Sequence, residues 1–387
     1  MTRLRYEKLS QYFHCSVEGQ EDPQDKVRKV RPMITRCEAR FGACFQPGKN
    51  ISIDEAMVKF DGRLGWKQYM PLKPAKWGMK LWCLCDAESG YCSAFSVYTG
   101  ATAGNGGLDL GYRVVMGLMK KYLLSNRHVY ADNYFTSVHL ASDLLQADIY
   151  LCGTTRASRR EFPNALAETH LFSGQSVKWT SYDGVTLTKW HDKRDVYIVS
   201  TADAGGEIVR QTRRNHQDVA LHVPTCVVSY NKSMGGVDHL DQMRSYYAVG
   251  RSGKRWWKYL FWALLDIGII NACTLWKLCN RPLPSNERRF SLKTFKVLLI
   301  HEMGDPAIAA RNAMAPPPMI RLTAQYTVEE HTVAEHPFVR FDVRKRACKL
   351  CQQEGRRRPS GRAIESSFGC TVCNVHLCKG CHVNYHA

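Results

Sequence analysis

The chain has 387 residues, which is enough for two or three domains with separate hydrophobic cores. It carries 54 Lys and Arg residues against 35 Asp and Glu residues, so its formal net charge of +19 predicts a polyanionic partner, nucleic acid first. The most apolar stretch, residues 259–276, contains Asp266 and Asn271, which disfavours a membrane span and predicts a buried helix. We expect no membrane partner and no small-molecule substrate.

The N-terminus has no apolar segment followed by a small-residue cleavage site, so we expect the chain to stay inside the cell. Of the 16 cysteines, those before Asn280 are scattered, whereas the later ones fall in close pairs. This distribution predicts reduced thiols and a zinc site rather than disulfide bonds.

Residues 1–48 are charged and interrupted by Gly and Pro, and they predict one helix over 30–45. From Ile51 the pattern predicts a meander of antiparallel strands over 51–60, 80–86 and 91–98. A helix over 111–124, a strand over 128–132 and a helix over 138–147 follow. Strands followed by alternating helices and strands indicate an α/β or α+β layered fold.

Residues 156–223 are more polar and predict a β-rich insertion with short strands over 177–180, 185–190 and 196–201. The apolar run 227–230 predicts a further strand, and Gly235-Gly236 precedes a helix that begins near Val237. Three successive prolines at 316–318 and the polar residues that follow predict a linker.

Asp54, Asp132 and Asp238 each lie at or beside the end of an apolar run, where a sheet can hold a carboxylate rigidly. Two hard cations that clamp a phosphodiester need oxygen ligands from separate parts of the chain. Asp241 lies one helical turn after Asp238 and is a candidate for an additional ligand or a positioning group. The alternative is that all four are ordinary strand-end or helix-capping aspartates.

The sequence motifs around these aspartates resemble those of the catalytic domain of the piggyBac transposase family. They occur in the family's order, and the resemblance covers most of the chain from about Arg5 onwards. They are SIDEAM at 52–57, FDGR at 60–63, YMPLKP at 69–74, KWGMKLW at 76–82, ADNYFTS at 131–137, LCGTTR at 151–156 and YNKSMGGVDHLDQM at 230–243.

The resemblance implies an RNase H-like catalytic core interrupted by a β-rich insertion. It also implies that Asp54, Asp132 and Asp238 are the triad that binds Mg²⁺ or Mn²⁺, with Asp241 a further acidic residue of the same motif. The implied partner is double-stranded DNA, at transposon ends and TTAA targets, bound by a homodimer in the nucleus.

The patterns and the resemblance together divide this α/β chain into seven segments. They are an N-terminal dimerisation and DNA-binding remnant (1–48), the first part of the catalytic core (49–158), the β-rich insertion (159–224), the last part of the core (225–248), a flanking helical dimerisation and DNA-binding region (249–315), a linker (316–343) and a C-terminal cysteine-rich zinc-binding domain (344–387).

Complete transposases of this family carry a further segment ahead of the position of Met1, and we expect that segment to be lacking here. Two functions therefore compete: a transposase that cleaves and joins DNA, and a transposon-derived protein that binds DNA or chromatin without cutting it. A third class, in which the zinc module binds histone tails or recruits a ubiquitin-conjugating enzyme, depends on analogy alone.

The C-terminal cysteines form three Cys-x2-Cys pairs, a spacing that suits tetrahedral zinc. With two histidines they offer eight ligands for two ions. We predict one site from Cys348, Cys351, Cys378 and Cys381, and a second site from Cys370, Cys373, His382 and His386. His376 competes for the second site, and a single zinc ribbon with spare cysteines is the alternative to two sites.

Basic residues cluster at two places that are candidates for contact with DNA phosphates. One group precedes and enters the zinc module: Arg344, Lys345, Arg346, Lys349, Arg356, Arg357, Arg358 and Arg362. The other contains Arg251, Lys254, Arg255 and Lys258 beside Trp256 and Trp257. These tryptophans are candidates either to stack on bases or to begin the hydrophobic helix that follows.

Overall fold

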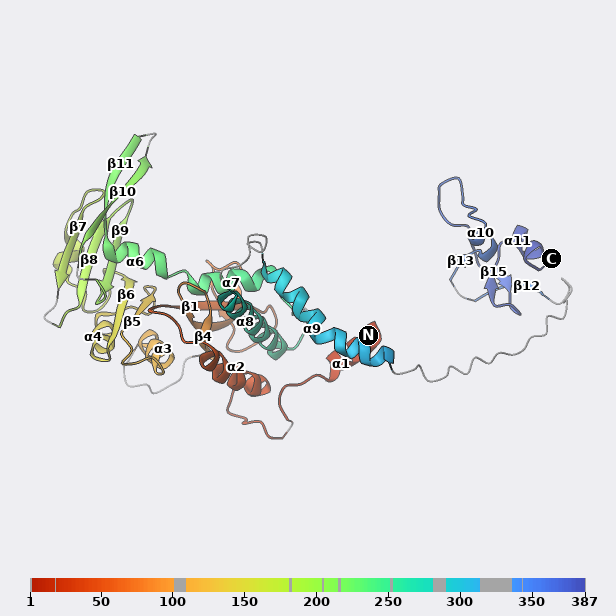
Figure 1. Ribbon diagram of the computed structural model, residues 1–387, viewed down its shortest axis with the longest axis horizontal. Coiled ribbons are helices and arrows are strands. Elements are labelled where there is room, and N and C mark those ends of the chain that lie inside the picture. Colours follow the sequence, from red (N-terminus) through yellow and green to blue (C-terminus); the bar gives the residue numbers. More distant parts are fainter. Residues whose placement is uncertain are drawn as a thin grey trace. The chain divides into compact units, whose positions relative to one another are not determined.

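The protein is described from a computed structural model that defines residues 2–17, 19–100, 109–180, 183–203, 205–214, 217–250, 253–280, 290–313, 336–342 and 344–386. It divides into two compact units, Met1–Glu302 and Met303–Ala387, which are described separately. The first unit contains the mixed sheet and most of the helices (Figure 1).

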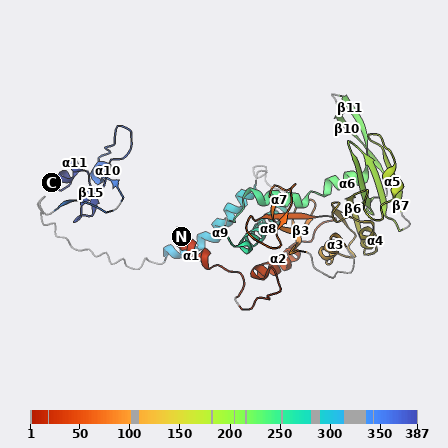
Figure 2. The same ribbon diagram turned by 180° about the vertical axis from the view of Figure 1, so that it is seen from behind.

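A nine-stranded sheet organises the first unit, and its first half is an antiparallel meander followed by two parallel strands. The antiparallel strands are β1 (Asn50–Lys59), β2 (Gln68–Tyr69), β3 (Trp77–Asp86) and β4 (Cys92–Val97). The strands parallel to β1 are β5 (Arg127–Ala131) and β6 (Ile149–Thr155). Strand β1 therefore lies between antiparallel β3 and parallel β5. Figures 1 and 2 show the strands of this unit from opposite sides.

The segment predicted as a β-rich insertion extends this same sheet. Strand β6 pairs antiparallel with β9, which leads through β8 to β7. The bounds are β7 (Ser176–Thr180), β8 (Thr186–His191) and β9 (Asp195–Ser200). A separate hairpin of β10 (Glu207–Arg214) and β11 (Gln217–Pro224) follows them.

One face of the sheet is covered by helices from both ends of the first unit. They are α2 (Arg31–Cys44), α7 (Gly236–Tyr246) and α8 (Trp256–Cys279). Ile34, Phe41 and Leu264 from these helices share a core with Ala56 and Leu81 of the sheet. Helix α7 packs directly on β1 and β3, so the segment around Asp238 reaches the strand that carries Asp54.

The opposite face is covered by α3 (Leu110–Met119) and α4 (Val138–Gln146), whose apolar sides form a second core with β1, β5 and β6. Ile51 and Ile53 point into this core, whereas Ala56 and Val58 point into the first. Such alternation is expected of a strand with helices on both sides.

Among the described residues, α8 is the one helix that is both long enough and apolar enough to cross a membrane. Its polar residues are instead bound inside the protein. Asn271 exchanges two hydrogen bonds of 2.9 Å with the backbone of Cys92, and the buried Asp266 forms an ion pair of 2.8 Å with Lys296. These contacts make α8 a core helix, as its buried polar residues predict.

Residues 225–233 form a helix, α6 (Thr225–Ser233), although the apolar run 227–230 predicts a strand. A run of four apolar residues does not by itself distinguish a strand from one face of a helix. Cys226 and Val227 are buried in a third core with Trp190 and Leu221, while Asn231 and Lys232 of α6 are exposed.

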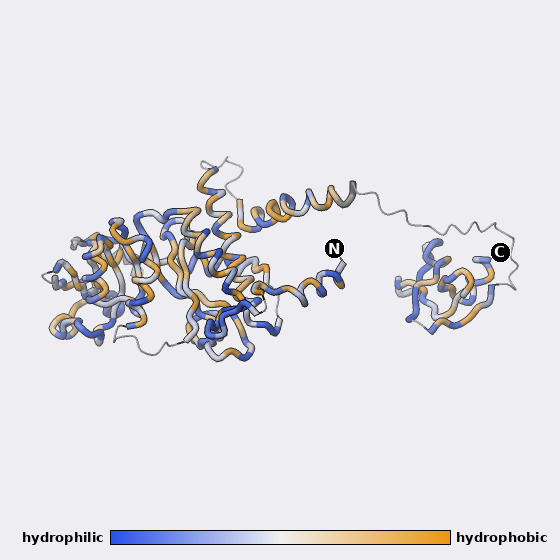
Figure 3. The backbone as a smooth tube through the Cα atoms, turned by 90° about the horizontal axis from the view of Figure 1, so that it is seen from below, coloured by the Kyte–Doolittle hydropathy of each residue, from blue (hydrophilic) through white to orange (hydrophobic). Residues whose placement is uncertain are grey.

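The remaining helices of the first unit are α1 (Arg3–Tyr12), the short 3₁₀ helix η1 (Arg28–Val30), α5 (Asn164–Glu168) and α9 (Leu292–Ala313), which continues into the second unit. Hydrophobic and hydrophilic residues alternate along α9 (Figure 3). Several of its apolar side chains are exposed, including Ile300 and Met303.

The cysteine-rich module consists of short elements. They are β12 (Phe338–Arg340), β13 (Arg346–Ala347), α10 (Lys349–Gln353), β14 (Glu365–Ser366), β15 (Phe368–Cys370), β16 (Val375–His376) and α11 (Lys379–His386). Strand β12 pairs with β15, so the residues from His336 to Arg340, which the sequence places in the linker, belong to this module.

We predict that Gly236→Ala destabilises the first unit. A Cβ at this position would lie 2.3 Å from Ser52 Oγ and 3.1 Å from the carbonyl oxygen of Asp86, so α7 would have to move away from the sheet. Overpacking of this kind costs about 1–3 kcal/mol, which urea denaturation would measure. The matched control is Gly235→Ala, where a Cβ meets nothing within 4 Å. Equal midpoints for the two variants would contradict the close approach of α7 to the sheet.

Candidate metal centres and nucleic-acid contacts

Parallel pairing of β1 with β5 brings two of the predicted aspartates together. Ile53 pairs with Ala131 in the register of these strands, and the next residues are Asp54 and Asp132. Glu55 joins them: ligand oxygens of Asp54, Glu55 and Asp132 all lie within 4.8 Å of one another. This group, named here the carboxylate site, matches the oxygen-rich ligand set that Mg²⁺ and Mn²⁺ prefer.

Backbone donors fix the two aspartates. Asp54 Oδ1 accepts a hydrogen bond of 2.7 Å from the amide of Glu55, and Asp132 Oδ1 accepts one of 2.9 Å from the amide of Tyr134. Thr136 Oγ1 donates to the carbonyl oxygen of Asp132 at 2.8 Å and closes the turn after β5. The turn lies so close to Gly153 that a Cβ there would be 2.1 Å from Thr136 Oγ1.

The carboxylate site carries more negative charge than its surroundings compensate. Burial, followed by the charge of Glu55, raises the pKa of Asp54 to about 7, although Lys73 opposes the rise. Burial also raises the pKa of Asp132, with a smaller contribution from Glu55. A cation bound among these oxygens would relieve this repulsion.

Lysines partly compensate Glu55. The Nζ of Lys80 lies 3.7 Å from the Glu55 carboxylate and 4.6 Å from the centre of the Tyr134 ring.

Glu55 was absent from the residues predicted from sequence. Its adjacency to Asp54 was the available signal, but neighbouring residues of a strand ordinarily point to opposite faces, which argues against a shared site.

Asp238 does not belong to the group of oxygens within 4.8 Å. It lies in the first turn of α7, its side chain is 71% exposed, and its Oδ1 is 3.8 Å from Lys73 Nζ. The same Nζ donates to the carbonyl oxygen of Glu55 at 3.1 Å. The side chain of Lys73 therefore connects Asp238 with the strand that forms the carboxylate site.

Asp241 has a structural position rather than one in the carboxylate site. Its Oδ2 accepts a hydrogen bond of 3.3 Å from the amide of Met57, and its Oδ1 accepts one of 2.8 Å from Arg244. Arg244 also donates to the carbonyl oxygen of Met57. Strand β5 pairs with β1 at Asn50–Ile53. Asp241 and Arg244 bind the backbone of β1 at Met57, beyond this paired segment, and so attach α7 to β1.

The first predicted cysteine group is assembled in the module. The sulfur atoms of Cys348, Cys351, Cys378 and Cys381 lie within 4.8 Å of one another. Burial tends to raise the pKa of Cys348, but hydrogen bonds from the backbone of Cys351 and Cys378, together with those from the side chains of Cys351 and Cys381, lower the pKa to about 7. Four clustered sulfurs of which one ionises readily fit a tetrahedral zinc ion.

The second group differs from the prediction by one histidine. The structure brings His336, Cys370, Cys373 and His386 within 4.8 Å of one another. His336 Nδ1 lies 3.4 Å from the sulfurs of both Cys370 and Cys373. His382 is outside this group: it is buried, and its ring packs 4.9 Å from that of Phe338.

The sequence missed His336 because this residue precedes Cys370 and Cys373 by 34 and 37 residues and has no ligand-like spacing to them. Pairing of β12 with β15 places it there. The competing His376 is used elsewhere, since its Nδ1 lies 2.9 Å from the carbonyl oxygen of Ser366.

Among the basic residues beside α8, Arg251 is outside the described residues, whereas Lys254 and Arg255 are exposed. Arg255 donates to the carbonyl oxygen of Gln11 at 3.2 Å. The neighbouring tryptophans favour the structural alternative: Trp257 is buried, and Trp256 packs edge-on against Trp66 at 5.4 Å.

The basic residues of the module are exposed, namely Arg344, Lys345, Arg346, Lys349, Arg356, Arg357, Arg358 and Arg362. Two of them also support the module itself. Arg356 donates to the sulfur of Cys381 at 3.2 Å, and Arg357 donates to the carbonyl oxygen of Gly361 at 3.2 Å.

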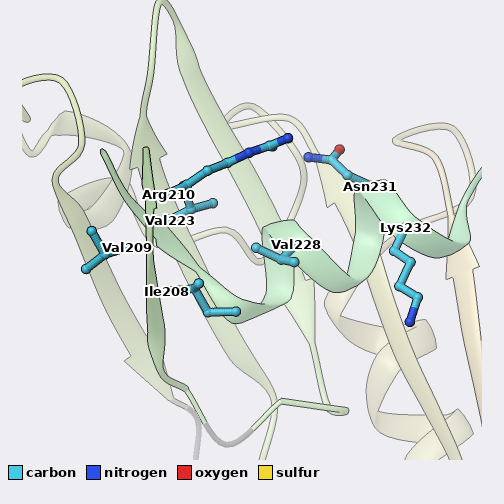
Figure 4. Close-up of a pocket in the computed structure, with 7 residues that line it drawn as sticks. All are labelled: Ile208, Val209, Arg210, Val223, Val228, Asn231 and Lys232. Carbon is cyan, nitrogen blue, oxygen red and sulfur yellow. The ribbon is translucent and has the colours of Figure 1, made fainter. Parts of the chain in front are cut away.

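A separate pocket lies between the β10–β11 hairpin and α6 (Figure 4). Arg210 and Asn231 extend toward one another across it, and apolar side chains of the hairpin and of α6 form its walls. The lining residues are Ile208, Val209, Arg210, Val223, Val228, Asn231 and Lys232. They include neither Asp54 nor Asp132, so the pocket is distinct from the carboxylate site.

The chain matches known proteins over most of its length. A family model described as Transposase IS4 matches residues 1–273. PiggyBac transposable element-derived protein 2 of Homo sapiens is 31% identical over 72% of this chain and 49% of its own length. PiggyBac transposable element-derived protein 3 of Homo sapiens is 24% identical over 100% of this chain and 63% of its own length. The chain thus spans about half to two thirds of these relatives.

The fold matches a solved structure as well. A cryo-EM structure of the piggyBac transposase synaptic complex with hairpin DNA superposes with a TM-score of 0.64 at 24% identity, covering 98% of this chain and 78% of that one. The mixed α/β architecture is therefore that of a piggyBac transposase. On the family match and these relatives, the chain belongs to the piggyBac transposase family.

Proposed function

We propose that the protein is a piggyBac-like DNA transposase that cleaves DNA and transfers strands at transposon ends and TTAA targets. The observation that carries this proposal is the carboxylate site formed by Asp54, Glu55 and Asp132 on adjacent parallel strands. The net charge of +19 suits a double-stranded DNA partner. We further propose that the protein acts as a homodimer in the nucleus, where its DNA targets lie.

The strand order supports an RNase H-like core. Strands β4, β3 and β1 form an antiparallel meander, and β5 and β6 add to β1 in parallel. In this arrangement the first long strand lies in the centre of the core. Asp54 is in that strand, and Asp132 directly follows its parallel neighbour.

The residues present fit a divalent cation. Asp54, Glu55 and Asp132 would hold it, and Asp238 is the candidate to supply oxygen to a second ion from α7. Bound Mg²⁺ or Mn²⁺ would supply Lewis acidity toward the phosphate and toward the attacking water. The chain's own contribution is to fix Asp54 and Asp132 through backbone hydrogen bonds and to place Lys73 and Lys80 beside the site.

A second function, binding of DNA or chromatin without cleavage, has one specific observation in its favour. Asp238 is exposed and lies near Lys73, outside the group formed by the other carboxylates. A transposon-derived protein that had lost cutting would tolerate such an incomplete set. Cleavage assays separate the two functions.

For the C-terminal module, we propose two zinc ions. The first has the ligands Cys348, Cys351, Cys378 and Cys381, and the second has His336, Cys370, Cys373 and His386. In this role the module presents its exposed arginines to DNA phosphates.

We predict that Mn²⁺ stabilises the protein through the carboxylate site. Saturating Mn²⁺ should raise the Tm by about 5 °C, because an ion that binds the folded state alone stabilises it by mass action. Asp54→Asn, Glu55→Gln and Asp132→Asn should each remove most of this shift, whereas the exposed Asp61→Asn should retain it. The shift should be smaller at pH 6 than at pH 8, because protons compete with metal for carboxyl groups of raised pKa.

In the absence of Mn²⁺, the Asp54→Asn variant should be at least as stable as the wild-type protein, because it removes a crowded, partly buried charge. A metal-free variant with a lower Tm would show that Asp54 serves the fold rather than a cation.

Cleavage is tested with duplexes that contain candidate transposon ends. Asp132→Asn should reduce nicking by at least about a hundredfold, because the metal site supplies several kcal/mol of charge stabilisation. DNA affinity should stay within about twofold, since no phosphate contact is removed. An equal loss in Asp238→Asn would place this residue in the reaction. Wild-type protein that binds these duplexes but never nicks them would favour the non-cutting function.

The zinc assignment predicts two ions per wild-type chain by elemental analysis. His336→Ala should retain one, because the second site loses a ligand, whereas His382→Ala should retain two. Chelation should unfold residues 336–386 and leave the first unit folded, because so small a module buries little apolar surface without its metal. Retention of two ions by His336→Ala and of one by His382→Ala would instead support the ligands predicted from sequence.

A further inference from the structure

Two aromatic side chains are exposed side by side where β2 pairs with the start of β3. Tyr69 and Trp77 are partners in the strand register, and they are 52% and 45% exposed. Their ring centres are 4.7 Å apart, with an angle of 41° between the ring planes. Large aromatic rings are costly to leave in water, so a paired exposed set indicates a binding surface.

The surroundings of these rings are basic. Lys67 Nζ lies 4.8 Å from the centre of the Trp77 ring, in a cation–π contact. Between residues 61 and 77 the sequence contains Arg63, Lys67, Lys73 and Lys76 but a single acidic residue, Asp61. Aromatic rings interleaved with cations are the combination that binds single-stranded nucleic acid, through base stacking and phosphate contacts.

The same segment reaches the carboxylate site. Lys73, between the two aromatic residues in sequence, donates to the carbonyl oxygen of Glu55 at 3.1 Å and lies 3.8 Å from Asp238. Gly78 pairs with Lys59, the last residue of β1, so Trp77 lies near that end of the strand. Lys59 is five residues beyond Asp54. At about 3.4 Å per residue and per nucleotide, a DNA strand leaving the site reaches the rings within roughly five nucleotides.

We propose that Tyr69 and Trp77 form a stacking platform for unpaired bases of the DNA strand that passes through the carboxylate site. Paired bases offer only their edges to a protein, whereas a ring can stack on a base that has left the duplex. The platform would hold the end that a cut separates from its partner strand. This inference rests on the proposed function, since it requires DNA at the carboxylate site.

The test compares two DNA probes in the absence of divalent metal, so that binding is measured without cutting. One is a blunt duplex, and the other is the same duplex with a single-stranded extension of six nucleotides. Trp77→Ala and Tyr69→Ala should each weaken binding of the extended probe by about tenfold and leave binding of the blunt duplex unchanged. Trp77→Phe should retain most of the affinity, because a ring remains available for stacking.

The matched control is Trp179→Ala in β7, where the tryptophan is 46% exposed, nearly the same as Trp77. This variant should bind both probes like the wild-type protein. Unchanged binding of the extended probe by Trp77→Ala would overturn the platform and leave the proposed function standing. Equal weakening on both probes would also overturn it, because the rings would then serve duplex DNA. Wild-type protein that binds neither probe would refute the proposed function itself.

Discussion

The register between β1 and β5 is the constraint on which the carboxylate site depends. Pairing of Ile53 with Ala131 sets the following residues, Asp54 and Asp132, next to one another although 78 positions separate them in sequence. Because the side chains of a strand alternate, a shift of one residue would point either aspartate to the other face of the sheet. The apolar residues that fix this register, including Ile51 and Val129, are fully buried in one core.

Burial of these strands also explains the electrostatics of the site. The strand pairing that brings the carboxyl groups together also excludes much of the water that would screen them, and the pKa of Asp54 rises to about 7. The fold alone therefore disfavours the ionised state that metal binding requires. Lys73 and Lys80 offset part of this repulsion. A site strained in this way gains most from the arrival of a divalent cation.

The fold was predictable from sequence where apolar periodicity was strong. Four elements lie close to their predicted positions, namely the helices at 31–44 and 138–146 and the strands β3 and β5. Asp54 and Asp132, which the structure brings together, were predicted as site residues because they lie at or beside the ends of apolar runs. Pattern alone was insufficient for short or distant features. The four apolar residues of α6 fit a strand equally well, Glu55 projects into a site that alternation assigns to Asp54, and His336 reaches its cysteines through the pairing of β12 with β15.

Attachment of α7 limits how Asp238 can join the carboxylate site. Asp241 and Arg244 both bind the backbone of Met57, and Gly236 lies against Ser52 with no room for a Cβ. Helix α7 is thus held against β1 at its start by Gly236 and further along by Asp241 and Arg244, so a large movement of the helix would break these contacts. The side chain of Lys73 contacts both Asp238 and the Glu55 carbonyl group, so its ammonium links α7 to the strand that forms the carboxylate site. A cation held by Asp238 would therefore have to compete with the Lys73 ammonium, which already supplies positive charge beside both Asp238 and β1.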